Sequence, residues 1–535
     1  MVRQILKDLI KDSLAKLQKR NVLPDFVIPE IVIEHPADEK HGDYSTNIAM
    51  RIAKIIEKPP LEIADDIVSK IEMKDSKIFH RVMTVQPGFI NFFLSQEFLQ
   101  ELVEKIFKKD FGKLEIGKGK KVNIEFISAN PTGPLHIGNG RGAFFGDALA
   151  NVLGKAGYKT TREYFINDAK KSNQIRELGK TVLGKGITYL TDKLKAQISR
   201  LRLSGFGGQA KLTEGEAGYR LAQIIQKDNE DFINKKLKIK FDEWFFEQKF
   251  LFDAGKIKKV LQWLKNKNLA YEKEGAVWLK TKEFGDEKDW VIIRSDGEPS
   301  YFLSDIAYHK DKINRSFDKI IDIWGADHQG HVQKMNAAMK ILDHKGEFDV
   351  LISQMVRLKS GKMSKRTGEI VRLEDLIDEV GLNVARFFYL TKSLNTQMEF
   401  DLDLAKEQSE KNPVYYVQYA YSRICSIFRK CGRSEIRNPK SENFKLLSHQ
   451  SELDLIKQLI RLPEIIEDTA KDYQVQRLPQ YATDLATSFH QFYRDCRVLG
   501  ENKELEKARL LLILATKIVL KNTLDLMGIS APEKM

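Results

Sequence analysis

The chain of 535 residues is 42% hydrophobic and 30% charged, and its 88 Lys and Arg residues against 75 Asp and Glu residues give a formal net charge of +13. This composition excludes intrinsic disorder, collagen and coiled-coil arrays, and the length predicts about three or four domains. The positive charge suggests a polyanionic partner, although a basic surface that serves only solubility remains an open alternative.

The cysteines and the apolar runs indicate the compartment. Three cysteines are too few for a disulfide framework and favour a reducing setting, for which we expect the cytoplasm. The amphipathic N-terminus contains Asp8 and Asp12 and resembles neither a secretory signal nor a transit peptide. No apolar run approaches the ~20 residues that span a bilayer, so we expect no membrane partner.

The first part of the chain predicts an α+β arrangement. A helix begins it, short strands are expected near 31–34 and 88–94, and helices lie between them. A segment rich in glycine and lysine at 112–121 predicts a linker to the next region.

From residue 121 the pattern changes to that of a parallel βαβ unit. The expected strand, turn, helix and strand lie at 122–127, 128–134, about 136–156 and 160–166. The lysine-rich range from about 170 to 290 predicts helical, inserted material, and further strands are expected at 290–294 and 320–324. From about 400 to the end we expect helices, with breaks near Pro413, 438–439, Pro463 and Pro479.

Two windows hold the charge excess. Residues 170–215 contain ten Lys and Arg against three Asp and Glu, and residues 411–440 contain seven against the single acid Glu435. In the second window four tyrosines, at 415, 416, 419 and 421, alternate with the cations. Aromatic faces beside cations suit unpaired nucleobases. A helix whose tyrosines face a core and whose arginines face water fits the same pattern.

A first candidate site follows the predicted strand at 122–127. Residues 130–142 read Asn-Pro-Thr-Gly-Pro-Leu-His-Ile-Gly-Asn-Gly-Arg-Gly. The start of a helix offers unpaired N–H groups to a phosphate, and the glycines at 138, 140 and 142 let a ligand approach the backbone. His136 and Asn139 are three residues apart, so on a helical turn both can donate to a phosphate oxygen. A bare glycine-rich turn with a surface histidine is the weaker interpretation of the full string.

A second candidate site is the cationic segment from Lys359 to Arg366, which contains Lys-Met-Ser-Lys-Arg at 362–366 with Gly361 and Gly368 beside it. Clustered cations repel one another unless an anion is present, so we interpret the segment as a loop that closes over a polyphosphate. An exposed basic loop or a nuclear-localisation-like run is the alternative.

A third candidate site, at 324–329, reads Trp-Gly-Ala-Asp-His-Gln at the end of a predicted strand. Open α/β sheets bind ligands at the carboxyl ends of their strands. Asp327 could accept from ribose hydroxyls and Gly325 would permit close approach, although a polar turn at a strand end is equally compatible.

Together, His-Ile-Gly-Asn at 136–139 and the later Lys-Met-Ser-Lys-Arg resemble the paired signature of the class I aminoacyl-tRNA synthetases. Other stretches resemble the arginyl-tRNA synthetases in particular, and the resemblance covers essentially the whole chain. These stretches are 125–139, 164–168, 301–308 and 527–535.

The resemblance implies a multidomain α/β and α fold. We expect an N-terminal α+β domain at 1–112 that binds the tRNA elbow. A Rossmann-type parallel-sheet catalytic domain is expected at 113–398, with insertions at about 175–290 and the cationic loop at 359–368. An all-α anticodon-binding domain of the DALR type is expected at 399–535.

The family's reaction supplies roles for individual residues. ATP and L-arginine would condense to arginyl-adenylate and pyrophosphate, and arginine would then move to the 3′-terminal adenosine of tRNA(Arg). The implied catalytic residues are His136, Asn139, Lys362 and Lys365. The implied ATP-binding residues are His136, Gly138, Asn139, Gly325, Asp327, His328, Met363, Ser364 and Lys365. The implied arginine-binding residues are Glu125, Ser128, Asn130, His136, Tyr301 and Asp305. The implied tRNA-binding residues are Phe89, Asn91, Tyr416, Tyr419 and Tyr493.

Some of these assignments have a direct chemical reason. A planar guanidinium favours a carboxylate that accepts two hydrogen bonds, as Asp305 can, and Tyr301 lies four residues away on the same helical face. Mg²⁺ would arrive with ATP and not in a protein cage. No zinc site is expected, because the cysteines and histidines lack ligand spacing. A monomer is the family's usual state.

Two departures from the family pattern stand out. Asn139 occupies the position where the class pattern has histidine, so a charged imidazole there is excluded. The second motif is intact, whereas many arginyl enzymes carry a degenerate version, so Lys365 needs no substitute. Another class I synthetase, a nucleotidylyl transferase and a non-catalytic RNA-binding paralogue remain the alternatives.

Overall fold

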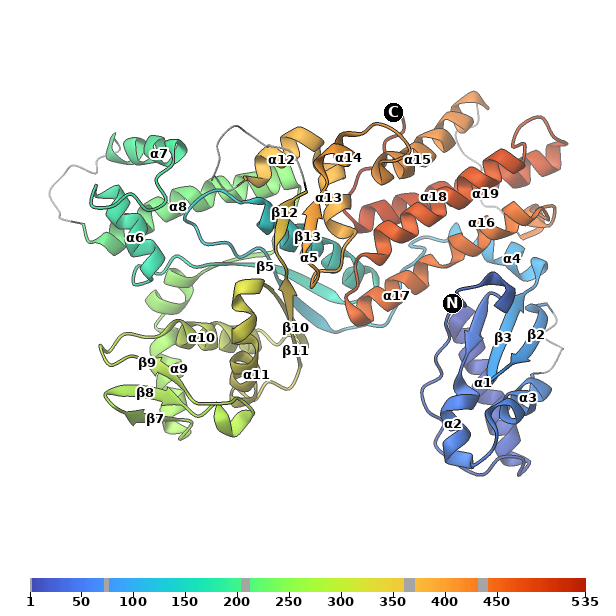
Figure 1. Ribbon diagram of the computed structural model, residues 1–535, viewed down its shortest axis with the longest axis horizontal. Coiled ribbons are helices and arrows are strands. Elements are labelled where there is room, and N and C mark those ends of the chain that lie inside the picture. The colour runs from blue at the N-terminus through green and yellow to red at the C-terminus, as the bar shows by residue number, and fades with distance from the viewer. Residues whose placement is uncertain (1, 72–76, 204–211, 360–370, 432–440) are drawn as a thin grey trace.

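The computed structural model describes residues 2–71, 77–203, 212–359, 371–431 and 441–535. Figure 1 shows a small N-terminal unit, a central parallel sheet with helices around it, and a bundle of long helices that ends the chain. The cationic motif at 362–366 lies outside the described residues.

The N-terminal unit packs helices on a three-stranded antiparallel sheet of order β1-β3-β2. The strand predicted near 88–94 is confirmed as β3. The strand predicted at 31–34 is wrong: Ile31 and Ile33 bury their side chains as a strand would, but the backbone forms only an isolated bridge from Glu34 to Ser45. The elements are α1 (Val2–Lys19), η1 (Glu39–His41), β1 (Tyr44–Thr46), α2 (Ile48–Ile56), α3 (Pro60–Lys70), β2 (Phe79–Val85), β3 (Phe89–Leu94) and α4 (Gln96–Ile106).

The central sheet has five parallel strands in the order β11-β10-β4-β5-β6. Its members are β4 (Lys121–Glu125), β5 (Lys159–Ile166), β6 (Glu243–Phe246), β10 (Lys319–Gly325) and β11 (Glu347–Ser353). The predicted βαβ unit is confirmed as β4, α5 (Ile137–Lys155) and β5. Chain order runs outward from β4 in one direction to β6 and in the other to β11. The loops that follow β4 and β10 therefore diverge, which opens a crevice at the carboxyl ends of these strands.

Helix α5 runs under the sheet with most of its residues buried. A Cβ atom at Gly146 would lie 2.3 Å from the ring of Phe126, so only glycine lets the helix approach this closely. Arg141, also buried, donates to the carbonyls of Ser393 and Thr396 at 2.5 and 2.6 Å. The first half of α5 is thus held by Phe126 and by the carbonyls of Ser393 and Thr396.

The range expected to be inserted material is less uniform than its composition suggested. It contains β6, the edge strand of the central sheet, and a separate antiparallel sheet of order β7-β8-β9. The strand predicted at 290–294 is β9 of this small sheet, and the one predicted at 320–324 is β10. The other elements are α6 (Asn173–Val182), α7 (Asp192–Leu203), α8 (Glu214–Phe232), η3 (Ile233–Leu237), η4 (Gln248–Asp253), α9 (Lys256–Asn266), β7 (Ala270–Lys273), β8 (Ala276–Leu279), η5 (Lys282–Phe284), β9 (Trp290–Ile293), α10 (Tyr301–Asn314), η6 (Ala326–His331) and α11 (Val332–Ile341).

The rest of the chain is mainly helical, as predicted. Pro413 and Pro463 lie in the first turns of α15 and α17, where a missing N–H costs nothing. Among the described residues, no helix is both long and apolar enough to cross a membrane. The elements are β12 (Val356–Leu358), α12 (Leu373–Val380), α13 (Leu382–Leu390), β13 (Met398–Phe400), α14 (Leu402–Lys406), α15 (Pro413–Lys430), η7 (Ser441–Phe444), α16 (Gln450–Ile460), α17 (Leu462–Asp472), α18 (Arg477–Asp495) and α19 (Lys503–Leu526).

Candidate active site

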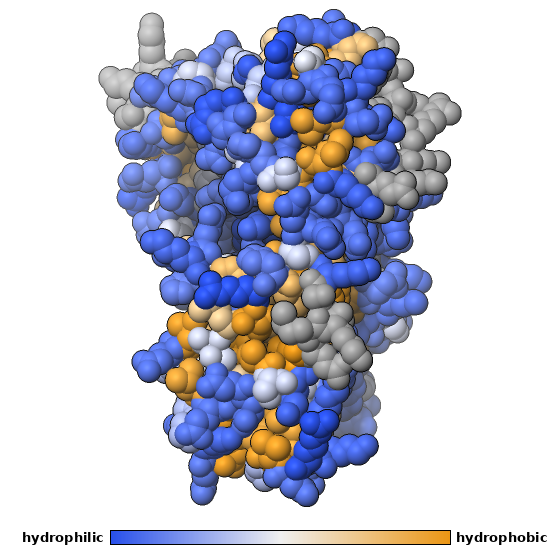
Figure 2. All heavy atoms as spheres, turned by 90° about the vertical axis from the view of Figure 1, so that its right-hand side faces the viewer, coloured by the Kyte–Doolittle hydropathy of each residue, from blue (hydrophilic) through white to orange (hydrophobic). Residues whose placement is uncertain are grey.

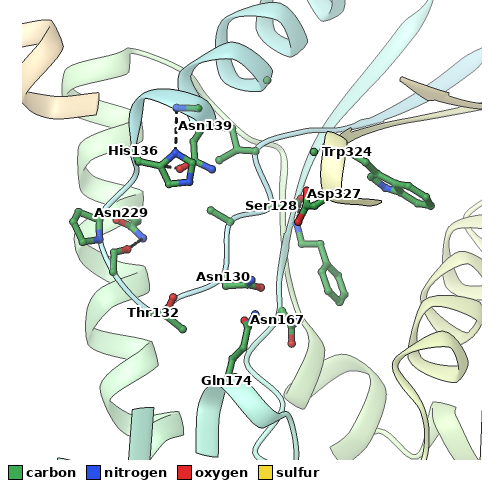
Figure 3. Close-up of a pocket in the computed structure, with 18 of the residues that line it drawn as sticks. Ser128, Asn130, Thr132, His136, Asn139, Asn167, Gln174, Asn229, Trp324 and Asp327 are labelled. Carbon is green, nitrogen blue, oxygen red and sulfur yellow. Dashed lines mark hydrogen bonds between the residues drawn. The ribbon is translucent and has the colours of Figure 1, made fainter. Parts of the chain in front are cut away.

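A cavity of about 2100 Å³ lies at the carboxyl ends of β4 and β10. Its walls come from the β4–α5 loop, the turn after β10, the first half of α10, and helices α6, α7 and α8 of the insertion. Figure 3 shows polar side chains from the two strand ends and from α6 and α8 around this space. The sequence prediction that the first and third motifs form one site is consistent with this placement.

The β4–α5 loop is held in an uncommon conformation. Ile127 and Ser128 both have positive φ, at 68° and 40°, which costs energy for residues other than glycine. The Ser128 hydroxyl accepts from the N–H of Phe165 at 3.1 Å and donates to Oε1 of Glu125 at 2.9 Å. These bonds orient Ser128 and Glu125 at the cavity wall.

The start of α5 has a reciprocal cap. Nδ1 of His136 accepts from the N–H of Gly138 at 3.1 Å, and Oδ1 of Asn139 accepts from the N–H of His136 at 2.9 Å (Figure 3). Partial burial lowers the pKa of His136, so the ring is neutral at pH 7. Since Nδ1 accepts, the proton is on Nε2, which is left to donate to a ligand.

Two of the motif glycines have a packing role. A Cβ atom at Gly140 would lie 2.8 Å from Leu373, and one at Gly325 would lie 2.5 Å from the carboxylate of Asp327. Gly140 therefore allows α5 to pack closely against α12. It does not line the cavity, so the prediction that it lets a ligand approach the backbone is wrong. Gly138, Gly142 and Gly325 do line the cavity.

Helix α10 contributes the expected pair Tyr301 and Asp305. Tyr301 is 52% exposed, and its hydroxyl accepts from the N–H of Asn173 at the start of α6. The Asp305 carboxylate makes no hydrogen bond with the described residues, and burial raises its pKa to about 6, with His309 and Lys334 opposing the rise. Lys334 on α11 is largely buried in the same wall, and sequence reasoning missed it.

A second carboxyl group, Glu247, lies behind Asp305 and was also missed. It is buried, and burial raises its pKa to about 8, with the nearby charges of Asp305 and Asp168 adding to the rise and a hydrogen bond from Ser304 opposing it. Its Oε2 atom has no hydrogen-bond partner among the described residues. Buried polar atoms are seldom left unpaired, so this oxygen indicates a missing hydrogen-bond partner.

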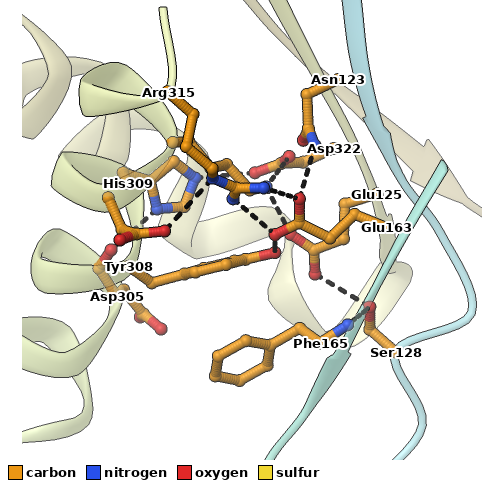
Figure 4. Close-up of polar contacts among 12 residues, drawn as sticks. Asn123, Glu125, Ser128, Glu163, Phe165, Asp305, Tyr308, His309, Arg315 and Asp322 are labelled. Atoms are coloured by element: carbon orange, nitrogen blue, oxygen red, sulfur yellow. Dashed lines mark hydrogen bonds and ion pairs between the residues drawn. The ribbon is translucent and has the colours of Figure 1, made fainter. Parts of the chain in front are cut away.

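A buried ionic network supports Glu125 from below. Lys312 on α10 donates to Oε2 of Glu125 at 2.6 Å and to Oδ1 of Asp322 at 2.7 Å. Burial alone would raise the pKa of Asp322, but Lys312 and His309 lower it to about 2. Figure 4 shows Glu125, Asp322, His309 and the neighbouring Glu163 converging between β4, β10 and α10. None of Lys312, His309 and Asp322 was expected from the sequence.

A second part of the network centres on Glu163 of β5. Arg315 donates to both of its oxygens, at 2.7 and 2.8 Å, and Tyr308 and Asn123 donate to it at 2.6 Å each. These bonds join α10 rigidly to the central sheet (Figure 4).

The remaining expected residues fall into two groups. Asn130, Asp327 and His328 lie at the cavity wall, and the carboxylate of Asp327 and the ring of His328 are exposed. Lys362, Met363, Ser364 and Lys365 lie outside the described residues.

The two residues expected to bind the tRNA elbow differ in exposure. Phe89 is 36% exposed, whereas Asn91 is 3% exposed and accepts from the hydroxyl of Ser45 at 2.7 Å. Figure 2 shows apolar side chains at the surface of the lower half of the molecule, where the N-terminal unit lies. The exposed apolar residues of this unit include Val27, Ile55 and Phe89.

The tyrosines of α15 divide between core and surface. Tyr421 is buried, whereas the rings of Tyr415 and Tyr419 stack with centroids 6.3 Å apart and an angle of 7°. The guanidinium of Arg423 lies 4.4 Å from the ring centroid of Tyr493 on α18 and 5.6 Å from that of Tyr419. His490 of α18 packs on Tyr416 and Tyr419. The core interpretation therefore holds for Tyr421, and binding of nucleobases at the remaining tyrosines stays a prediction, to which the structure adds Arg423 and His490 as neighbours.

The basic window at 170–215 is partly neutralised. Lys171 pairs with Glu298 at 2.8 Å and Lys180 pairs with Glu177 at 2.7 Å. Glu177 is already counted in the net excess of 170–215, so of these two pairs only that of Lys171 with Glu298 reduces the excess further. Within 411–440, residues 432–440 lie outside the described part of the chain.

Family models match three parts of the chain. The model of the arginyl tRNA synthetase N terminal domain matches residues 4–94, that of the class I (R) tRNA synthetase catalytic domain matches 210–403, and that of the DALR anticodon binding domain matches 417–535.

Similar proteins extend this match to the full length. The arginine–tRNA ligase of Caldanaerobacter subterraneus subsp. tengcongensis is 43% identical over 560 residues, which cover 100% of this chain and 99% of the relative. That of Bacillus subtilis strain 168 is 41% identical over 561 residues and 100% of both chains. The solved arginyl-tRNA synthetase of Thermus thermophilus has the same fold, with a TM-score of 0.78 at 22% identity and coverage of 100% of both chains.

Proposed function

The chain belongs to the arginyl-tRNA synthetase family, whose members catalyse arginine–tRNA ligation, and we propose that the chain activates arginine in the cavity at the ends of β4 and β10. One observation carries this assignment: the carboxylate of Asp305 lies at the cavity wall without a hydrogen bond to any described residue, and a second buried carboxyl group, Glu247 with its unpaired Oε2, lies behind it. An unpaired carboxylate at the wall favours a ligand that is both cationic and rich in planar donors.

In the proposed complex the guanidinium of arginine lies against Asp305 and Glu247, with the ring of Tyr301 at its side. A lysine would bind weakly because one ammonium cannot satisfy two carboxylate oxygens in the same plane. Glu125, Ser128 and Asn130 would contact the α-ammonium and carboxylate groups. The carboxylate of arginine would then lie near the start of α5, where it attacks the α-phosphate of ATP.

ATP would be bound between the start of α5 and the turn after β10. Nε2 of His136, which is left free to donate, and the side-chain amide of Asn139 would hold phosphate oxygens, aided by the helix N-terminus. Gly138, Gly325, Asp327, His328, Met363 and Ser364 would contact the nucleotide. Lys362 and Lys365 would stabilise the pentavalent transition state and the leaving pyrophosphate. Catalysis would come from positioning and charge, without a covalent enzyme intermediate.

Transfer RNA would contact three regions. Phe89 and Asn91 are proposed for the elbow, with Asn91 acting through the position of its strand because its side chain is buried. The basic window at 170–215 would face the acceptor end. Tyr416, Tyr419 and Tyr493, with Arg423, would stack and pair with anticodon bases.

Mg²⁺ would be bound to the ATP phosphates, and no three His, Cys, Asp or Glu side chains of the described residues group as a metal site. We propose a cytoplasmic monomer with domains at 1–112, 113–398 and 399–535.

The proposal is tested by ATP–pyrophosphate exchange with each amino acid, with and without tRNA(Arg). With arginine we expect exchange in the presence of tRNA(Arg) and no exchange without tRNA. Asp305→Ala should raise the arginine KM and lower kcat/KM, whereas Lys365→Ala should mainly lower kcat. An unchanged arginine KM in Asp305→Ala would refute the proposal that Asp305 binds the guanidinium group.

A further inference from the structure

Lys312 is a buried cation that the proposed reaction does not use. It lies on α10, two turns beyond Asp305, and its exposed fraction is 0%. Its ammonium group contacts two carboxylates, Glu125 at 2.6 Å and Asp322 at 2.7 Å, and lies 4.4 Å from the ring centroid of Tyr308. A charge removed from water this completely is tolerated only when it is paired. The pairing joins three elements: α10, β4 and β10.

The Asp322 side of this network is immobilised. Nε2 of His309 lies 2.7 Å from Oδ2 of Asp322, and Nδ1 lies 2.7 Å from the backbone carbonyl of Asp305. Both of these partners are oxygens, so the ring of His309 is held at both nitrogens between β10 and α10. Asp322 thus receives hydrogen bonds on each oxygen and holds Lys312 in one position.

The Glu125 side reaches the cavity. Oε2 of Glu125 accepts from Lys312 and Oε1 accepts from Ser128, whose own hydroxyl is fixed by the N–H of Phe165 (Figure 4). Two donors on different oxygens prevent the carboxylate from rotating. Each oxygen retains a lone pair, and Glu125 is part of the cavity wall.

We propose that Lys312 is a positioning residue that holds the Glu125 carboxylate in one orientation for the α-ammonium group of the amino acid substrate. This inference depends on the proposed placement of arginine. Its consequence is specificity for a free α-amino group, because an α-ammonium group would donate to the lone pairs that Lys312 and Ser128 leave on the Glu125 carboxylate. Guanidinium recognition at Asp305 should be independent of it.

The test uses the full-length enzyme with tRNA(Arg) and two ligands. Arginine is measured by its KM and kcat in ATP–pyrophosphate exchange. 5-Guanidinopentanoate, which lacks the α-amino group, is measured by its inhibition constant. We expect Lys312→Met to raise the arginine KM by about 10- to 100-fold while the inhibition constant of 5-guanidinopentanoate changes less than about threefold. Equal weakening of both ligands, or an arginine KM within twofold of wild type, would overturn the proposal.

Loss of a buried cation can also damage folding, so two further variants are needed. The double variant Lys312→Met with Asp322→Asn removes both members of the ion pair, so Asp322 is not left as a buried charge without Lys312. It should again raise the arginine KM while the inhibition constant of 5-guanidinopentanoate changes little. Arg509→Met, which breaks the buried pair of Arg509 with Glu452 at 2.7 Å in the helical region, is the matched control for a lost buried cation. It should lower stability and leave the arginine KM unchanged.

A double-mutant cycle separates this role from the placement of arginine. Glu125→Gln should raise the arginine KM, and adding Lys312→Met should raise it less than twofold further. Additive losses would show that Lys312 acts elsewhere. An unchanged KM in Glu125→Gln would instead refute the placement of the α-ammonium group itself, and a wild-type enzyme inactive with arginine would refute the proposed site.

Discussion

The backbone N–H of His136 donates to Oδ1 of Asn139 across 2.9 Å, so the residue that departs from the class pattern closes the first turn of α5. In return, Nδ1 of His136 accepts from the N–H of Gly138. The side-chain amide of Asn139 is then the part that can reach a phosphate. One residue thereby combines a structural cap with a proposed contact to ATP.

Substitutions at Asn139 should separate these two roles. Asn139→Ala loses the acceptor and should lower the free energy of unfolding by about 1 kcal/mol, with a moderate rise in the ATP KM. Asn139→Asp keeps the acceptor and should preserve stability, but its negative charge should raise the ATP KM about tenfold or more. Thermal unfolding and pyrophosphate exchange measure the two effects. If Asn139→Asp leaves the ATP KM unchanged, the side chain lies away from the phosphates.

Arginine use should depend on pH through Asp305. Burial raises its pKa from the ordinary value of 3.8 to about 6, and only the ionised form attracts a guanidinium. We expect kcat/KM for arginine to fall about tenfold per pH unit below pH 6, because the free enzyme must then release a proton. The ATP KM over the same range serves as the control. A flat profile between pH 5 and 7 would contradict the assigned role.

The buried carboxylate of Asp305 should also lower the free energy of unfolding at neutral pH. Because its folded-state pKa is raised, the folded protein holds the proton more tightly, and the free energy of unfolding falls as pH rises from about 4 to about 6. Asp305→Asn should therefore stabilise the protein at pH 7.5 by on the order of 2 kcal/mol while it removes arginine binding. Denaturant unfolding at pH 4 and 7.5 checks this, and an equal effect at both pH values would contradict it.

Arginine binding should release a proton from Glu247. With a pKa of about 8, Glu247 is mostly protonated at pH 7, and a guanidinium against its unpaired Oε2 would lower that pKa. We expect close to one proton released per arginine at pH 7, measured by titration calorimetry in buffers of different ionisation enthalpy. Glu247→Gln should abolish most of the release. Release that persists unchanged in this variant would place the guanidinium away from Glu247.

The surface cluster of Tyr419, Arg423 and Tyr493 on α15 and α18 should affect the binding of tRNA and not that of arginine. Tyr419→Ala or Arg423→Gln should raise the tRNA(Arg) KM about tenfold, since a stacked base contributes roughly 1–3 kcal/mol, and leave the arginine KM unchanged. Tyr421→Phe, on the same helix but in the core, is the control and should leave the tRNA KM at the wild-type value. Loss of arginine affinity in Tyr419→Ala would indicate a general folding defect instead.

Local patterns were enough to predict much of this protein. The β4–α5–β5 unit follows from a strand, a glycine-rich turn and a helix that are adjacent in the chain, and Asp305 was found because it lies within a contiguous motif. The strand expected at 31–34 failed because alternating burial of Ile31 and Ile33 reports where side chains point, and only a partner strand decides whether the backbone pairs.

The sequence by itself therefore determined the family, the order of the main elements and the residues of the contiguous motifs. Only the tertiary structure decided which carboxylates remain unpaired and which are neutralised. Glu125 and Lys312 are 187 residues apart, and nothing near either one in the chain indicates the other. Burial and long-range pairing set the charge state of a group, and both arise only when distant strands and helices exclude water together.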